Sequence, residues 1–259
     1  MSAGASGRTL HVVGIGCGDP AHLTGQAVAA LGTAAYALAP RKARGDGGAD
    51  PLVEVRRRVL AAAAPDLELV EVADPERDRS ARVAGDAEAY RGAVADWHGA
   101  RAEAYERVLL ERPGDAAFLV WGDPAFYDST LRIVDAMLAR GRVGADVRVV
   151  PGISSLQLLA AAHRIVLHEV GQPITVTTGR RLGEAVAAGA ENVLVMLNAT
   201  LELDGLEDWT IWWGANLAAP DERLVAGRVG DVLDEIRATR AAVKDAAGWV
   251  MDAYLLRRP

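Results

Sequence analysis

Cysteine and histidine are scarce in this chain. Cys17 is the only cysteine among 259 residues, and the five histidines are scattered along the sequence. A single cysteine excludes an internal disulfide framework and is typical of the reducing cytoplasm, where we expect the protein to act. So few soft ligands also argue against a structural metal site, and we expect none.

Long hydrophobic runs and blocks of positive charge are missing as well. No apolar run approaches the ~20 residues that span a bilayer, and the polar residues 1–9 contain no signal-peptide core. The net charge is −7 and no basic block stands out, which argues against a nucleic-acid partner. We therefore expect neither a membrane nor a nucleic acid as a partner.

Apolar runs alternate with amphipathic segments along the whole chain. Hydrophobic residues make up 51% of the sequence, which is enough to form the core of one large or two small domains. Strands are predicted in the first half at residues 10–16, 35–38 (ended by Pro40), 67–72, 116–120 and 146–150. Helices are predicted between them at residues 24–33, with Val28 and Leu31 facing inward, and at 51–64, 86–112 and 131–140.

The second half has a different order of elements. Strands are predicted at residues 174–178, 193–197, 209–215 and 248–256, and helices at 154–163, 182–188 and 229–240. Regular alternation in the first half favours a mostly parallel sheet, whereas the second half favours a mixed sheet. The sequence therefore predicts an α/β fold with domains at residues 1–152 and 153–259.

The first glycine-rich loop does not match a dinucleotide-binding fingerprint. Residues 14–18 read Gly-Ile-Gly-Cys-Gly, but Asp19 stands where the last glycine of the fingerprint belongs, and Pro20 follows it. A carboxylate at that position repels phosphate, so we reject nucleotide-phosphate binding. The glycines form either a tight turn or a floor on which a flat ligand can lie close.

Two more loops each follow a predicted strand and lead into a predicted helix. Residues 121–130 read Trp-Gly-Asp-Pro-Ala-Phe-Tyr-Asp-Ser-Thr, and residues 151–155 read Pro-Gly-Ile-Ser-Ser. Each is either a capped turn or a ligand-binding strand end, because open α/β sheets bind ligands at the carboxyl ends of their strands.

Together, these loops resemble those of the tetrapyrrole methylase family, and the resemblance runs from about Leu10 to Leu256. It is strongest to members that methylate precorrin-5 at C-1 and release the extruded acetyl group as acetate, giving precorrin-6A. The segments that carry this narrower match are residues 89–91, 97–98, 118–132, 177–182, 213–215, 220–222 and 248–256. The resemblance implies two α/β domains with the active site in the cleft between them, and we expect a homodimer.

The cofactor implied by the resemblance is S-adenosylmethionine (SAM), with S-adenosylhomocysteine as its product. The implied contacts, many through backbone groups, are Cys17, Trp121, Gly122, Asp123, Phe126, Ser154, Ser155, Met196 and Ala215. Cys17 stands where the family often has proline, Trp121 where glycine is frequent, and Ser155 where alanine is common. Asp123 can accept from either the ribose or the ammonium group, and Phe126 or Met196 can pack on the adenine.

A precorrin carries several carboxylates, so the substrate side of the site needs cations and amides. Arg180 and Arg181, which follow a strand end, are the leading candidates, with Gly16 and Asp19 lining the same side. Arg41, Lys42 and Arg44 are weaker candidates. Acetate release needs water and perhaps a general base, for which Asp19, His98 and Tyr127 are weak candidates.

Other functions remain open from the residues alone. Within the family, the substrate could be another precorrin, uroporphyrinogen, an rRNA or a protein side chain, although the acidic net charge counts against RNA. Outside it, the chain could be a nucleotide- or ligand-binding module without chemistry, against which the Asp19-Pro20 pair counts.

Overall fold

The computed structural model describes residues 7–42, 50–76 and 87–259, and for residues 87–91 it describes the backbone alone. The chain divides into two compact units, Met1–Ile153 and Ser154–Pro259. Each unit contains its own five-stranded sheet. The predicted α/β class, with a parallel sheet followed by a mixed one, is confirmed.

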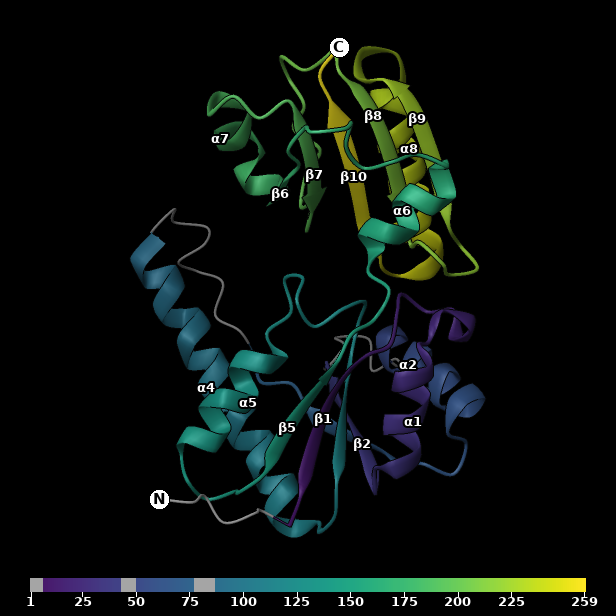
Figure 1. Ribbon diagram of the computed structural model, residues 1–259. Coiled ribbons are helices and arrows are strands. Elements are labelled where there is room, and N and C mark those ends of the chain that lie inside the picture. The colour runs from purple at the N-terminus through teal and green to yellow at the C-terminus, as the bar shows by residue number, and fades with distance from the viewer. Residues whose placement is uncertain (1–6, 43–49, 77–86) are drawn as a thin grey trace. The chain divides into compact units, whose positions relative to one another are not determined.

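The first sheet is parallel and has the strand order β3-β2-β4-β1-β5. Its strands are β1 Thr9–Gly14, β2 Tyr36–Arg41, β3 Leu69–Ala73, β4 Ala116–Val120 and β5 Asp146–Val150. The helices between them are α1 Gly25–Thr33, α2 Pro51–Ala63, α4 Ala87–Glu111 and α5 Thr130–Ala139, with the short 3-10 helix η1 at Pro20–His22. Helices α1 and α2 cover one face of this sheet, and α4 and α5 cover the other (Figure 1).

Strand β4 forms the middle of this unit, and all five of its residues are buried. Its alternate side chains enter two cores, because successive residues of a strand point to opposite faces. Phe118 packs edge-on against Tyr105 of α4, with ring centroids 5.1 Å apart. Leu119 belongs to the other core, with Leu31 of α1 and Val59 of α2. Covering on both faces explains why β4 is an unbroken apolar run.

Two predictions about this unit are wrong. Strand β2 does not end before Pro40 but continues to Arg41. Its amide at Ala37 donates to Glu68 on the β3 side, so the nitrogen of Pro40 faces the β4 side, where strand pairing ends at Leu38. A proline is tolerated there because no ladder hydrogen bond is lost.

The second correction concerns helix α1. Val28 is 40% exposed, whereas Ala27 and Leu31 are buried. The buried stripe of α1 therefore includes small alanines, and Val28 lies one position away from it. Thr24 caps this helix, since its Oγ1 accepts from the Ala27 amide at 3.0 Å.

The second sheet has the order β6-β7-β10-β8-β9, in which only β6 and β7 run parallel. Its strands are β6 Thr175–Thr178, β7 Asn192–Met196, β8 Thr210–Ala215, β9 Arg223–Arg228 and β10 Asp252–Arg257. Its helices are α6 Ser155–His163, α7 Leu182–Ala187 and α8 Val229–Ala247, with the 3-10 helix η2 at Gly179–Arg181. Strand β9 was not predicted, because it is a mostly exposed edge strand in which only Val225 is buried.

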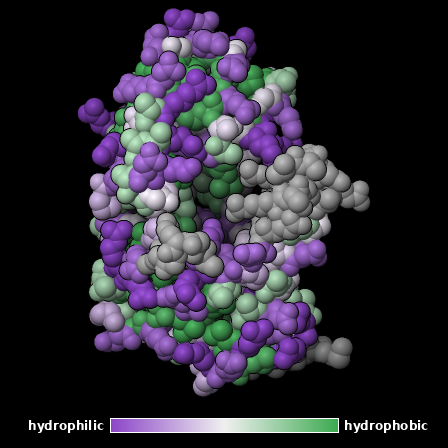
Figure 2. All heavy atoms as spheres, turned by 180° about the vertical axis from the view of Figure 1, so that it is seen from behind, coloured by the Kyte–Doolittle hydropathy of each residue, from purple (hydrophilic) through white to green (hydrophobic). Residues whose placement is uncertain are grey.

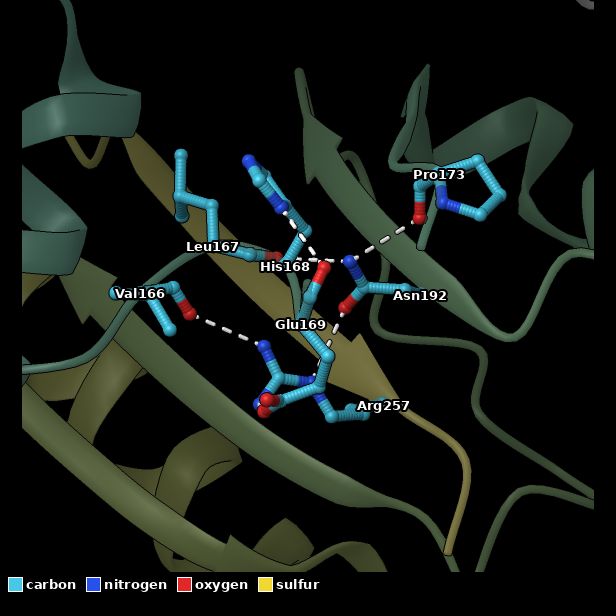
Figure 3. Close-up of polar contacts among 7 residues, drawn as sticks. All are labelled: Val166, Leu167, His168, Glu169, Pro173, Asn192 and Arg257. Carbon is cyan, nitrogen blue, oxygen red and sulfur yellow. Dashed lines mark hydrogen bonds and ion pairs between the residues drawn. The ribbon is translucent and has the colours of Figure 1, made fainter. Parts of the chain in front are cut away.

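Two side chains of this unit anchor the connection between α6 and β6 (Figure 3). Asn192 begins β7 and Arg257 ends β10, and the Nε of Arg257 donates to the Oδ1 of Asn192 at 3.3 Å. Together they bind three carbonyls and one carboxylate of the connection, those of Val166, Leu167, Pro173 and Glu169. The connection is thus tied to the sheet by side chains instead of by strand pairing.

The face shown in Figure 2 mixes hydrophilic residues with smaller hydrophobic patches. Within the described residues, none of the helices combines the length and the apolar character that crossing a membrane requires.

Candidate functional site

The loops after β1 and β4 are joined by backbone pairing. Beyond the ends of the two strands, the Gly16 amide donates to the Gly122 carbonyl at 3.2 Å, and the Gly122 amide donates to the Gly16 carbonyl at 2.8 Å. Gly16 has a φ of 70° and Gly122 a φ of 67°, in the left-handed region that favours glycine. These two strand ends therefore close upon each other and hold their loops in fixed positions.

Asp123 attaches a third loop, the one that follows β5. Its Oδ1 accepts from the Ala125 amide at 2.8 Å, and its Oδ2 accepts from the Gly152 amide at 2.8 Å. A Cβ atom on Gly152 would lie 2.2 Å from the Gly122 carbonyl oxygen, so this position admits only glycine. The predicted cofactor contact Asp123 thus already orders two loops, and each oxygen keeps a lone pair that can accept from a ligand.

Cys17 and Trp121 meet where the first two loops pack together. Cys17 is buried, and burial raises the pKa of its thiol to about 12, although a hydrogen bond with the Trp121 side chain partly opposes the rise. The thiol is therefore protonated at neutral pH, and a protonated thiol is a poor nucleophile. Two positions that the resemblance marks as unusual, Cys17 and Trp121, are in contact with each other.

The loop between β4 and α5 contains a strained aromatic residue. Tyr127 has a φ of 51° and is 44% exposed, whereas Phe126 beside it is half-buried. A bulky residue in the left-handed region costs conformational energy, and such residues cluster at functional sites. Asp128 supports the turn, since its Oδ1 accepts from the Thr130 amide at 2.6 Å at the start of α5.

In the second unit, the predicted residues lie at strand ends and at a helix start. Met196 ends β7 and is half-buried, and Ala215 ends β8 with no exposed surface. Ser154 caps α6 in a capping box with Gln157, and Ser155 is the first residue of that helix. The side chain of Ser154 is thus already engaged, and its role as a cap agrees with the simpler of the two predicted readings.

A polar network that the sequence did not reveal supports the Met196 strand end. The Nε of Arg240 donates to the Oδ2 of Asp252 at 3.0 Å, and its Nη2 donates to the carbonyl of Asn198 at 3.0 Å. The Nδ2 of Asn198 donates in turn to the Asp252 carbonyl at 3.2 Å, and the Trp213 indole donates to the Asp252 carboxylate at 3.1 Å. These residues lie on a helix, a loop and two strands, so no local pattern could have linked them.

The three predicted catalytic candidates lie on different elements. Asp19 caps η1, where its Oδ1 accepts from the Ala21 amide at 2.8 Å. Tyr127 lies on the loop after β4. His98 lies on α4 beside Trp97, with ring centroids 5.3 Å apart.

The predicted substrate arginines are exposed at the end of β6. Arg180 and Arg181 belong to η2, and the Nη2 of Arg181 pairs with Glu184 at 2.9 Å. Of the weaker candidates, Arg41 pairs with Glu71 at 3.3 Å, and Arg44 lies outside the described residues. The side chains of residues 89–91, which contribute to the narrower resemblance, also lie outside the description. Over residues 7–42, 50–76 and 87–259, no group of three or more His, Cys, Asp or Glu side chains is placed to hold a metal ion.

The amino-acid sequence of this chain matches those of known proteins. Residues 9–233 match the model of the Tetrapyrrole (Corrin/Porphyrin) Methylases. The precorrin-6A synthase [deacetylating] of Sinorhizobium sp is 44% identical over 263 residues, which cover 99% of this chain and 97% of that protein.

Solved structures agree with the sequence relatives. A structure from Corynebacterium diphtheriae described as a cobalamin synthesis related protein (CobF) has a TM-score of 0.81 at 34% identity, covering 97% of this chain and 98% of that one. Uroporphyrin-III C-methyl transferase from Thermus thermophilus, complexed with S-adenosyl homocysteine, has a TM-score of 0.59 at 21% identity and covers 97% and 92% of the two chains. The chain therefore belongs to the tetrapyrrole (corrin/porphyrin) methylase family.

Proposed function

We propose that this chain is a SAM-dependent C-methyltransferase that methylates precorrin-5 at C-1 and releases acetate, giving precorrin-6A. The observation that carries the proposal is the 44% identity, over nearly its full length, to a protein named precorrin-6A synthase [deacetylating]. Cobalamin biosynthesis is the corresponding pathway. The single cysteine supports a cytoplasmic location, and the resemblance suggests a homodimer.

The residues of the first unit are compatible with SAM. When bound, SAM supplies a methyl group on a positively charged sulfur. The loops after β1, β4 and β5 present backbone groups in fixed positions, and Asp123 retains acceptor capacity. Cys17 is kept protonated by burial, so its thiol does not compete with the substrate carbon for an electrophilic methyl group. Met196 and Ala215 of the second unit are assigned to the cofactor on the resemblance alone.

For the methyl transfer, the protein mainly has to align the two reactants. The ring carbon of a precorrin is already nucleophilic, so a strong protein base is not obligatory. Holding the two reactants in line can contribute ~7–11 kcal/mol to lowering the barrier. Removal of the acetyl group needs water in addition, and Asp19, His98 and Tyr127 are the residues we propose to test as its general base.

Carboxylates of the substrate need cationic partners, for which we propose Arg180 and Arg181, and we also assign Gly16 and Asp19 to the substrate on the resemblance alone. Arg181 can exchange its present partner for a substrate carboxylate, because an exposed ion pair such as Arg181–Glu184 is worth only ~0–1 kcal/mol.

The proposal is tested by binding and by turnover. Purified protein should take up S-adenosylhomocysteine in calorimetric titrations at micromolar concentrations. Incubation with precorrin-5 and SAM should yield acetate and a methylated product in the mass spectrum. If no cofactor is taken up, the methyltransferase proposal is wrong. If the cofactor binds but only another precorrin or uroporphyrinogen is methylated, the substrate assignment is wrong and the family activity stands.

Two variants test the division of roles. Asp123→Ala should weaken S-adenosylhomocysteine binding by about tenfold or more, because it removes a proposed acceptor for the cofactor and releases the two loop amides that Asp123 holds. Arg181→Ala should raise the KM for precorrin-5 and leave cofactor affinity nearly intact. Arg258→Ala, which removes an exposed partner of Glu191, is the control. Equal losses of cofactor affinity in the Asp123 and Arg181 variants would contradict this division.

A further inference from the structure

Strands β2 and β4 separate at the carboxyl edge of the first sheet. Their pairing ends at Leu38 and Phe118, although β2 continues beside β3 as far as Arg41 and Ala73. The carbonyl of Val120 accepts from Ile15 on the β1 side, so the carbonyl of Leu119 faces β2. If the register continued, the nitrogen facing Leu119 would belong to Pro40, which carries no proton. The covalent structure of the chain therefore leaves the two strands unpaired beyond Leu38 and Phe118, and this unpaired interval is called the β2/β4 crevice below.

Arg56 of α2 reaches into this crevice. Its Nε donates to the unpaired Leu119 carbonyl at 3.2 Å, and its Nη1 donates to the Leu52 carbonyl at 3.0 Å. The residue is only 7% exposed. Among the described residues, no carboxylate forms an ion pair with Arg56 and its Nη2 makes no hydrogen bond. The next residue, Arg57, is exposed and pairs with both Glu54 and Glu71.

Groups from both faces of the sheet act on Arg56. Tyr105 and Arg101 come from α4 on the opposite face, yet both lie close enough to interact electrostatically with its guanidinium. Burial raises the pKa of Tyr105 to about 12, so its hydroxyl is neutral and can donate. This is a topological switch point, because β2 leads to a helix on one face and β4 to a helix on the other. Ligands bind in such crevices at the carboxyl ends of strands.

Three described acids around Arg56 and its neighbours Tyr105 and Arg101 are engaged elsewhere. Asp50 accepts from the amides of Leu52 and Lys42, each at 3.0 Å. Asp128 accepts from the Thr130 amide at 2.6 Å. Asp74 pairs with Arg101 at 2.8 Å. Within the part of the chain that the structure describes, Arg56 is therefore a buried cation without a carboxylate in direct contact.

We propose that Arg56 binds a carboxylate side chain of the substrate within this β2/β4 crevice. The inference rests on the proposed function, which supplies a substrate with acetate and propionate arms. A buried unpaired guanidinium is unfavourable, and a carboxylate compensates it with charge-assisted hydrogen bonds. The adjacent crevice between β1 and β4 is closed by the Gly16–Gly122 pairing, so it offers no comparable entry. Arg56 thereby fixes one edge of the macrocycle relative to the loops after β1 and β4.

The test compares Arg56→Lys and Arg56→Gln with the matched control Arg57→Gln. We expect both Arg56 variants to raise the KM for precorrin-5 at least tenfold, with the dissociation constant for S-adenosylhomocysteine changed less than twofold. Arg57→Gln should change neither quantity. An unchanged KM in a folded Arg56 variant would overturn the proposal. A parallel loss of cofactor affinity would do the same, because it would indicate a purely structural role.

A measurement on the unaltered protein covers the case in which the variants do not fold. Precorrin-5 derivatives, each with one carboxylate converted to an amide, are compared as substrates. At least one derivative should show a KM raised tenfold or more, and that penalty should shrink in Arg56→Lys. If every monoamide matches the parent compound, no buried arginine recognises a carboxylate and the inference is wrong. If the unaltered protein does not act on precorrin-5 at all, the proposed function fails and the inference fails with it.

Discussion

At the scale of single residues, His11 is a buried titratable group with no evident part in the chemistry. It lies in β1, is 5% exposed, and neither ring nitrogen has a hydrogen-bond partner among the described residues. Burial lowers its pKa below the ordinary value, the charge of Arg148 acts in the same direction, and Asp115 opposes them. The folded protein therefore holds His11 neutral more strongly than the unfolded chain does.

The stability of the fold should depend on pH through this residue. Because the folded pKa lies below the unfolded value near 6.5, the unfolded chain binds more protons as the pH falls. The contribution of His11 is complete above about pH 6.5 and declines as the pH drops towards its folded pKa. In urea unfolding at about pH 7.5 and pH 5.5, His11→Leu should lose less stability on acidification than the unaltered protein. His168→Gln, which removes an exposed imidazole, is the control, and an equal loss in all three proteins would contradict the assignment.

Arg56 shows what could and could not be predicted for single residues. In the sequence it belongs to a run of three arginines, which usually indicates a solvated surface. Its spacing from Val53 and Val59 places it on the buried stripe of α2, and that signal was present. The position that its side chain occupies, beside the unpaired ends of β2 and β4, depends on the register of these two strands, which no local sequence pattern encodes. The contact of Cys17 with Trp121 was hidden for the same reason, since the two residues belong to different strand ends.

At the scale of elements, a buried carboxylate joins α4 to the end of α5. Glu106 of α4 is 1% exposed and accepts from the Nε of Arg140 at 3.1 Å and from the Nη1 of Arg142 at 3.0 Å. Each arginine alone can still compensate the charge of Glu106. A buried carboxylate without any partner is strongly unfavourable.

Replacing these two arginines should therefore have a non-additive effect. Arg140→Gln or Arg142→Gln alone should lower the free energy of unfolding by about 1 kcal/mol, the value of one hydrogen bond. The double variant should lower it by about 3–5 kcal/mol, because Glu106 is then buried without a counter-charge. Urea denaturation measures all three, with Arg258→Gln, from an exposed ion pair, as the control near zero. A double effect equal to the sum of the single effects would contradict the shared role.

Elements were predictable where burial was continuous and local. Strand β4 was predicted with the observed bounds, because an apolar run buried on both faces is conspicuous. Strand β9 was not predicted, because its residues are mostly exposed and form no continuous apolar run. Its pairing with β8 is visible only in the structure, although the two strands are close in the chain. Pro40 was interpreted as a strand breaker, a rule that holds only where both sides of the strand are paired.

At the scale of the whole molecule, each unit has a core of its own. Tyr105, Phe118 and Met137 belong to the first unit, whereas Trp213, Ile236 and Tyr254 belong to the second. The sequences of three loops were enough to recognise the family, because these loops lie at strand ends where the backbone conformation requires glycine and proline. The roles of individual side chains could not be predicted in the same way, because Asp123 and Ser154 also have structural partners within the protein.

Cofactor binding should be visible in the stability of the molecule. A ligand that binds only the folded state stabilises it by RT ln(1 + [L]/Kd), which is ~2.7 kcal/mol at a hundredfold excess over Kd. S-adenosylhomocysteine at that excess should raise the free energy of unfolding of the unaltered protein by this amount in urea titrations. At the same ligand concentration, Asp123→Ala should show a smaller increase. No increase in the unaltered protein would contradict the proposed cofactor.

The missing proton of Pro40 has a consequence for the energetics of recognition. Parallel strands gain hydrogen bonds by pairing along their full length, so an opening between them normally has to be forced by a ligand. Here one strand cannot donate at that point, and the Arg56 side chain supplies the donor that the backbone lacks. The crevice is thus preorganised, and a ligand that enters it breaks no strand pairing, so that more of the contact energy is retained as affinity.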